Sequence, residues 1–215
     1  MRIGLFICVL AATVQPALAT EVDEIALMMT KLVGTQSVAF RPQSQNGQLI
    51  GCTLEFDALV RDWKYRNGGF LKLAGSFGIL APGGANVGAM QKLTVSHLDY
   101  SGLELQVNPS SPSRLFMRDR EFRSNIASLV NATESDAPGS FFAVYNLSPT
   151  MEIILAGIER GEIVIGFNQM NGESDIELDL QLDVASMDND GNRTKSTDAR
   201  RGFMACLMTL SERLK

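Results

Sequence analysis

Residues 49–80 read LIGCTLEFDALVRDWKYRNGGFLKLAGSFGIL and predict a long β-hairpin that organises the rest of the chain. Apolar and polar residues alternate from Cys52 to Arg61, the two-residue period of a strand with one buried and one exposed face. The Asn-Gly-Gly sequence at 67–69 tolerates a positive φ and leads directly into a second apolar run, as a tight hairpin requires. We therefore expect Cys52 to point into the core.

The alternation in the first strand of this hairpin changes phase before the turn. Leu59, Trp63 and Tyr65 have the opposite parity to Cys52 and Phe56. Either both faces of the strand are covered at this point or a β-bulge shifts its register. The sequence leaves both alternatives open.

The first nineteen residues have the pattern of an export signal. Arg2 gives a positive start, Ile3 to Val14 is apolar, and Ala17-Leu18-Ala19 supplies the small residues that a signal peptidase accepts. The apolar run of about twelve residues is shorter than the roughly 20 that a membrane-spanning helix needs. We expect cleavage, a mature chain from Thr20, and a periplasmic or secreted location in a bacterium.

Two cysteines remain after removal of this segment, because Cys8 lies inside its apolar run. Export would place Cys52 and Cys206 where disulfides form and persist, and neither has the CxxC spacing of a redox site. A bond between them would close a loop of about 150 residues and remove at most about 5 kcal/mol of unfolded-chain entropy. We predict a structural disulfide, with two separate buried thiols as the alternative.

The charge balance excludes a typical nucleic-acid-binding protein. The chain has 19 basic and 24 acidic residues, a net charge of −5. Affinity for nucleic acid comes chiefly from clustered lysine and arginine, which this composition does not favour. We expect no nucleic-acid partner and no transmembrane segment after signal cleavage.

Apolar spacing predicts helices at both ends of the mature chain and in its middle. Residues three and four apart form stripes from Glu21 to Val33 and from Asp198 to Leu214, where Cys206 lies on the packing side. A third helix begins near Ser148-Pro149 and ends at Gly161. A fourth is expected from Arg120 to Asn131, with Phe122, Ile126, Leu129 and Val130 on one face.

Short β-strands account for most of the remaining apolar segments. The alternation of apolar and polar residues is most regular from Ile176 to Val184, and a polar loop is expected from Met187 to Lys195. Loops rich in proline and glycine or polar residues are expected at 41–48 and 81–88. The other predicted strands are 35–40, 92–98, 103–107, 141–147 and 163–167.

These elements predict an α+β fold made mainly of antiparallel sheet. The short amino-terminal helix packs at an edge or end of the core, and the disulfide attaches the carboxy-terminal helix to the sheet. We expect one exported globular domain over residues 20–215, with a possible seam at 108–140. A two-sheet sandwich, or two β-rich halves that meet at that seam, is the alternative.

An acidic face is the strongest candidate for a binding surface. Eight acidic residues and no lysine or arginine occur between Gly161 and Asn192. A solvated face that discourages edge pairing, a docking surface for a cationic partner and a weak Ca²⁺ site are alternatives, as is pairing with basic residues of the first hairpin. Four of the acids are assigned to one strand face, namely Asp175, Glu177, Asp179 and Asp183.

No arrangement of residues specifies a catalytic or metal site. His97 is the single histidine and no GxSxG elbow accompanies it, so a strand or turn position is the preferred interpretation. Asp188, Asp190 and Asn192 begin like a calcium loop, but Arg193 stands where glycine is required. Gly83, Gly84 and Gly88 lack the spacing of a phosphate-binding loop. We expect no cofactor and no metal.

These features favour a non-enzymatic, exported envelope or periplasmic protein that acts by binding or in a structural role, with a protein or envelope component as its partner. The alternative is a hydrolase acting on envelope or polysaccharide material, because Asp and Glu alone can act as an acid and base pair on glycosides. Two carboxyls that face each other across a cleft, about 5 to 10 Å apart, would favour the hydrolase. A flat, exposed row of acids would favour binding or solubility alone.

Overall fold

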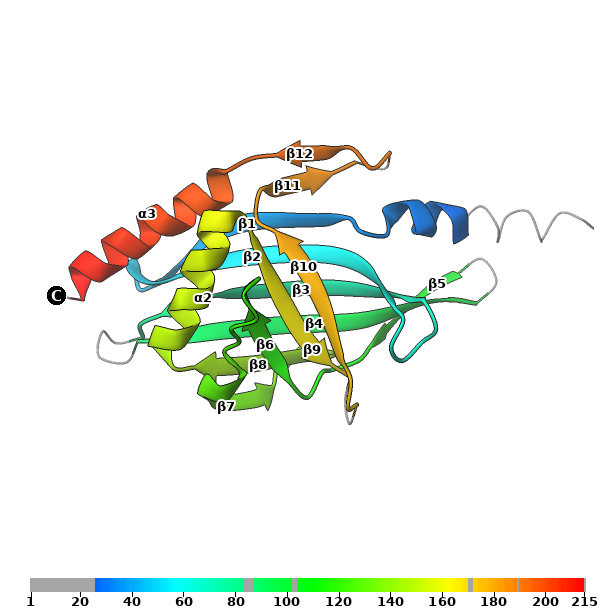
Figure 1. Cartoon of the computed structure of the whole chain (residues 1–215), viewed down its shortest axis with the longest axis horizontal. Coiled ribbons are helices and arrows are strands. Elements are labelled where there is room, and N and C mark those ends of the chain that lie inside the picture. The colour runs from blue at the N-terminus through cyan, green and yellow to red at the C-terminus, as the bar shows by residue number, and fades with distance from the viewer. Residues whose placement is uncertain (1–25, 83–86, 102–103, 170–171, 189, 215) are drawn as a thin grey trace, which may run out of the picture.

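The computed structural model describes residues 26–214 except 83–86, 102–103, 170–171 and 189 (Figure 1). Its amino-terminal helix is described over residues 26–32, and the long helices are α2 (Leu147–Arg160) and α3 (Asp198–Arg213). A single 3₁₀ turn, η1, spans Ile126–Ser128. The strands are β1 (Gln36–Gln45), β2 (Gln48–Asp62), β3 (Gly69–Leu80), β4 (Gly88–Ser101), β5 (Glu104–Pro109), β6 (Leu115–Arg118), β7 (Leu129–Glu134), β8 (Ser140–Tyr145), β9 (Glu162–Asn168), β10 (Asp175–Gln181), β11 (Val184–Met187) and β12 (Arg193–Lys195).

A seven-stranded antiparallel sheet forms the larger layer. Its strand order is β1-β2-β3-β4-β8-β7, and β5 pairs with the far end of β4. The predicted hairpin is its centre, because β2 pairs with β3 from Gly51–Leu80 to Asp62–Gly69 without a register shift. Asn67 (φ 49°) and Gly68 (φ 88°) take the left-handed backbone that the turn needs. The mainly antiparallel α+β fold is confirmed.

One face of this sheet, which we call the inner face, is covered by the other layer. The three-stranded sheet β10-β9-β6 crosses it diagonally, and α2 and α3 lie beside it (Figure 1). One continuous apolar core joins both sheets and both helices, and it includes Leu73 on β3, Ile165 on β9, Ile154 on α2 and Phe203 on α3. The alternative of a second sheet packed on the first is therefore also part of the structure.

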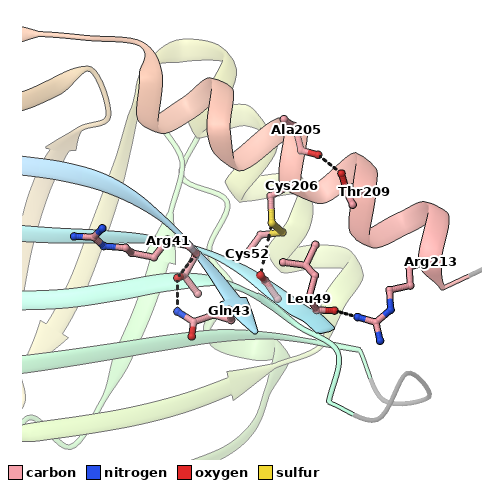
Figure 2. Close-up of a disulfide and its surroundings, with 10 residues drawn as sticks. Arg41, Gln43, Leu49, Cys52, Ala205, Cys206, Thr209 and Arg213 are labelled. Carbon is pink, nitrogen blue, oxygen red and sulfur yellow. Dashed lines mark hydrogen bonds between the residues drawn. A yellow bond between two sulfur atoms is a disulfide. The ribbon is translucent and has the colours of Figure 1, made fainter. Parts of the chain in front are cut away.

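The disulfide attaches α3 to the large sheet as predicted. Cys52 on β2 and Cys206 on α3 are bonded, with their Cα atoms 5.9 Å apart. Figure 2 shows Arg213 on the last turn of α3 reaching the carbonyl oxygen of Leu49, to which it donates a hydrogen bond. A bond from Arg213 to the Gln48 side chain, at 2.7 Å, adds to this contact. The helix is thus fixed to β2 both covalently and by hydrogen bonds.

The phase change in β2 reflects two covered faces at Leu59 alone, because Trp63 and Tyr65 follow the end of the strand and Trp63 is 68% exposed. No register shift separates β2 from β3, so the bulge alternative is wrong. Leu59 points to the opposite face from Phe56 and is buried there by Met29 of the amino-terminal helix, beside Leu98 of β4. A hydrogen bond from Arg61 to Thr30, at 2.9 Å, adds to this contact. The amino-terminal helix therefore covers one end of the outer face.

The predicted helix from Arg120 to Asn131 is wrong. The chain reverses at Asp119, whose carboxylate accepts hydrogen bonds from the backbone and side chain of Arg123, and Phe122 has a φ of 64°. The buried side chain of Asn125 then accepts a bond from the N–H of Met117. These local bonds compete with a helix, and residues 129–134 pair with the otherwise unpaired edge of β8 instead.

The predictions for residues 176–195 were also wrong in part. The strand β10 ends at Gln181, and the chain then bends so that Asp183 lies between β10 and β11. The expected polar loop is largely a hairpin, because β11 pairs with β12 through Met187–Arg193 and Val184–Lys195. Its strands are short and mostly exposed, so they lack the alternation of apolar and polar residues that would predict them.

Strands from both sides of residues 108–140 share the large sheet. Ala89 to Thr94 of β4 pair with Tyr145 to Ser140 of β8, so the sheet is continuous across the expected seam. The loop predicted at 41–48 is partly strand, since β1 extends to Gln45, and β5 extends to Pro109, inside the expected seam. The predicted signal segment 1–19, Gly83 and Gly84 lie outside the described residues. Within the described ranges, no helix is both long enough and apolar enough to span a membrane.

Candidate functional site

The acidic face is largely an ion-paired surface. Asp175 and Glu177 point outward from β10, and each pairs with an arginine on or beside β6. Arg114 donates to Asp175 at 2.5 Å, and Arg118 donates to both oxygens of Glu177, at 3.2 and 2.5 Å. The negative charges that were predicted to attract a cationic partner are therefore partly neutralised by arginines of the same chain.

Of the remaining two predicted acids, Asp179 continues the outward row of β10, whereas Asp183 does not. Asp179 is exposed on β10 and has no ion-pair partner within 4 Å among the residues that the structure describes. Asp183 lies beyond the strand and pairs with Lys195 of β12 at 3.2 Å. Neither pairs with the first hairpin, so the hypothesis that its basic residues face these acids is wrong. The ion pair between Arg118 and Glu177 joins residues 59 positions apart, so no local pattern in the sequence predicts it.

A polar cluster surrounds His97 at one end of the inner face. The fully buried carboxylate of Asp62 accepts bonds from the backbone N–H groups of Lys64 and Tyr65 and, at 2.5 Å, from the Gln169 side chain. Because β2 and β9 supply these groups, the carboxylate fixes the hairpin turn to the end of the small sheet. Because these hydrogen bonds satisfy the buried carboxylate of Asp62, a structural role accounts for its burial.

The environment of His97 favours the neutral form of its imidazole. Burial lowers its pKa, and the positive charge of Arg66 adds to that effect against the opposing charges of Asp62 and Asp99. Its Nδ1 atom is buried and has no hydrogen-bond partner among the described residues. Burial raises the pKa of Asp99, but bonds from Asn108 and Arg66 outweigh this and hold it below its usual value.

The calcium-like sequence forms a tight turn within the β11–β12 hairpin. The Asp188 carboxylate accepts bonds from the backbone N–H groups of Asp190 and Asn192 and from the Asn192 side chain, at 2.8 to 3.0 Å. The bonds from Asn192 lower the pKa of Asp188. Throughout the described part of the chain, no three His, Cys, Asp or Glu side chains converge as metal ligands would.

The outer face of the large sheet carries an apolar hollow at each end. The first, of about 450 Å³, lies beneath the amino-terminal helix. Met29 and Leu32 of the helix, Leu59 and Leu98 of the sheet, and Leu105 of β5 line it. Asp57 and Lys72 give it a polar side, and residues 185–187 of β11 complete it.

The second hollow, of about 460 Å³, lies at the opposite end of the outer face and is more uniformly apolar. Met90 of β4 pairs with Val144 of β8, which pairs in turn with Asn131 of β7. The hollow therefore reaches the edge of the sheet. Its lining residues include Leu80, Val87, Met90, Val130, Phe142, Val144 and Leu147.

Between the two hollows, the outer face has small and polar side chains. Glu55 and Asp57 lie two residues apart on β2, beside Lys92 and Thr94 of β4, in a shallow depression of about 230 Å³. Successive outward residues of one strand form a row along the sheet. These two carboxylates therefore do not face each other across a cleft.

The edge of the sheet at β7 was missed by sequence reasoning. β7 ends the strand order, and β8 is the only named element with which it makes extensive contact in the described structure. Leu129 and Val130 are exposed, and a register shift separates Leu129 from Asn131. The β-branched residues of the segment LVNATE were a weak signal for a strand, which the competing helical spacing obscured.

Comparison with models of protein families, with curated proteins and with solved structures finds no significant match to this chain. The function must therefore be argued from the site itself.

Proposed function

We propose that this chain is an exported envelope or periplasmic protein that acts by binding another component of the envelope through the outer face of its large sheet. One observation carries the proposal. The inner face is covered by the small sheet and two helices, whereas the outer face carries two apolar hollows, of about 450 and 460 Å³. Hollows of this size and lining are typical of binding sites.

The export part of the proposal rests on the amino-terminal sequence and on the disulfide. The run Ile3 to Val14 and the small residues at 17–19 fit a cleaved signal. The Cys52–Cys206 bond is of a kind that persists outside the reducing cytoplasm. A bacterial periplasm meets both requirements.

The hydrolase alternative gains no support from a specific arrangement of carboxylates. The acids at the hollows of the outer face lie in a row on β2, and those of β10 are mostly paired with arginine. A glycoside hydrolase needs two carboxyls that flank a bound sugar. The binding proposal therefore rests on shape and apolar surface, and not on acid–base chemistry.

Export is tested by expressing the full chain in a bacterium and measuring the mass of the product in each cell fraction. We expect a periplasmic product that starts at Thr20 and has no thiol free to alkylation. The control is Leu10→Arg, which interrupts the apolar run and leaves the sequence from Thr20 unchanged. Full-length protein of both forms in the cytoplasm, with free thiols, would contradict the proposal.

Binding is tested by immobilising the exported protein and passing a detergent extract of the bacterial envelope over it. A protein of similar size and net charge serves as the control. We expect the protein to retain an envelope component that the control does not retain. Val130→Glu and Leu105→Glu each alter one hollow, so the variant that weakens retention shows which end of the outer face binds the component. Retention equal to that of the control would contradict a binding function.

A further inference from the structure

The two edges of the large sheet are treated differently. β1 has β11 and α3 beside it, whereas β7 has no strand or helix on its far side in the described structure. An edge strand leaves half of its backbone N–H and C=O groups without a strand partner. Apart from its pairing with β8, the only backbone hydrogen bond found from residues 129–134 in the described structure is that of the Leu129 N–H with the Ile126 carbonyl of η1, so residues 130–134 have none to another element. β7 therefore offers a template for one more strand.

The second hollow opens directly beside this edge. Val130, whose side chain is 62% exposed, belongs to β7 and also lines the hollow. The other lining residues nearest to it, Phe142 and Val144, are on the adjacent strand β8. A strand added to β7 could thus insert an apolar side chain into the hollow while its backbone pairs with the edge, as in known modes of strand addition.

The charges along this edge are of one sign. Between Ser124 and Ser140 the sequence contains Glu134 and Asp136 and no lysine or arginine. Both acids are exposed, and no ion pair to either is found in the described structure. The edge is therefore apolar near Val130 and acidic near Glu134, which favours a partner that is apolar at one end and basic at the other.

Edge strands without such a role are usually protected. Proline, lysine and β-bulges are common devices that prevent pairing with another chain. β7 contains neither proline nor lysine, and its one irregularity, between Leu129 and Asn131, leaves Asn131 to Glu134 in regular pairing with β8. Four residues with regular geometry thus remain available on this edge.

We propose that an extended peptide segment of a partner protein pairs antiparallel with β7, inserts an apolar side chain beside Val130 and places basic side chains against Glu134 and Asp136. Antiparallel pairing matches every other pair in this sheet. In that direction the basic residues precede the apolar residue in the partner's sequence. This inference rests on the proposed binding function and specifies the chemical class of its partner.

The test uses a fluorescent peptide, Lys-Ser-Lys-Thr-Thr-Leu-Ser-Thr, and the exported, disulfide-bonded protein, with binding followed by anisotropy. With the second lysine opposite Glu134, the leucine lies opposite Asn131, whose partner Val144 lines the hollow. The control peptide has glutamate in place of both lysines. We expect saturable binding of the lysine peptide and binding of the glutamate peptide that is weaker by roughly fivefold or more at low salt. Hydrogen exchange at residues 129–134 should slow when the lysine peptide binds.

Matched variants locate the site on the protein. Val130→Glu should weaken lysine-peptide binding by about tenfold, because it places a charge at the mouth of the hollow. Val107→Glu makes the same substitution on β5, the other exposed strand of the sheet, where the valine is 54% exposed, and should leave binding unchanged. Glu134→Lys combined with Asp136→Lys should reverse the preference between the two peptides. Fluorescence of Trp63 confirms that each variant is folded.

Several results would overturn the inference. They are a lysine peptide that does not bind, an equal effect of Val130→Glu and Val107→Glu, or protection from exchange outside residues 129–134. Dimerisation that protects β7 without peptide would show that a second copy occupies the edge instead. Failure of the peptide with an exported protein that still retains an envelope component removes this inference alone, whereas failure of export removes the proposed function.

Discussion

The two outermost strands of the large sheet, β1 and β7, differ in what lies beside them. β1 is covered by the β11–β12 hairpin and by α3, which the Cys52–Cys206 bond holds in place. β7 has a single strand partner in the described structure, and its residue Val130 is largely exposed. From this difference we expect stability to be concentrated at the β1 edge, whereas the β7 edge is the one proposed above for binding. Four predictions follow from this comparison, in order of decreasing effect.

Removal of the disulfide should have the largest effect, because it releases the covered edge. We expect Cys52→Ala combined with Cys206→Ala to lower the free energy of unfolding by up to about 5 kcal/mol, the loop-entropy limit for a cross-link of this length. Urea unfolding followed by Trp63 fluorescence measures the change. Equal stability of the variant and the disulfide-bonded protein would show that α3 holds β1 without the covalent bond.

Matched leucine truncations compare the two edges directly. Leu210 on α3 is 3% exposed, whereas Leu129 on β7 is 46% exposed. We expect Leu210→Ala to cost about 2–5 kcal/mol and Leu129→Ala less than about 1 kcal/mol. The same urea titration gives both values. A larger loss at Leu129 would mean that β7 is part of the folded core and unsuited to an added strand.

A pH titration should show a smaller effect on the free energy of unfolding, from His97 on β4, which pairs with Asn108 of β5. Burial lowers the pKa of His97 from 6.5, so the unfolded chain takes up a proton at a higher pH than the folded one. The contribution of His97 to the free energy of unfolding is fully present above about pH 6.5 and is lost as the pH decreases toward the folded pKa.

The variant His97→Gln provides the control for this titration. Because glutamine does not titrate, the fall in stability between neutral pH and the folded pKa of His97 should disappear from the profile. Thermal unfolding across this range measures it. The loss that follows from Asp99, whose pKa is below 3.8, should appear only at more acidic pH and should persist in the variant.

The smallest effect is expected on the acidic face, which belongs to neither edge of the large sheet. Glu177→Gln removes an ion pair whose glutamate is 42% exposed, so we expect a loss of about 0.2–1 kcal/mol that decreases at high salt. Asp179→Asn, where no such pair is found in the described structure, serves as the control. A loss of several kcal/mol at Glu177 would mean that the ion pairs hold the small sheet together.

The elements that the sequence predicted correctly are those set by residues close together in the chain. The β2–β3 hairpin followed from alternation and from the Asn-Gly-Gly turn, and α3 from its apolar stripe. Gly161 ends α2 with a φ of 80°, as expected, although the helix begins at Leu147, one residue before the predicted start at Ser148. The disulfide could be predicted because only two cysteines remained to pair.

The features that were missed depend on contacts between distant segments. Residues 120–131 have helical spacing, yet the bonds of Asp119 with Arg123 and the free edge of β8 favour a turn and a strand. Likewise, Arg114 and Arg118 meet acids about 60 residues away, which no window of sequence displays. The second hollow combines residues of four strands, β3, β4, β7 and β8, and could be found only when their order in the sheet was known.

The position of the disulfide has a consequence for any experiment that cuts the chain. Because it joins residues separated by 154 positions, residues 52–206 form a covalent ring, and the amino-terminal helix, β1 and the end of α3 lie outside it. A protease that cleaves once within this ring produces two pieces that migrate together until a reductant separates them. A single cut between Cys52 and Cys206 would therefore open the molecule without releasing either piece.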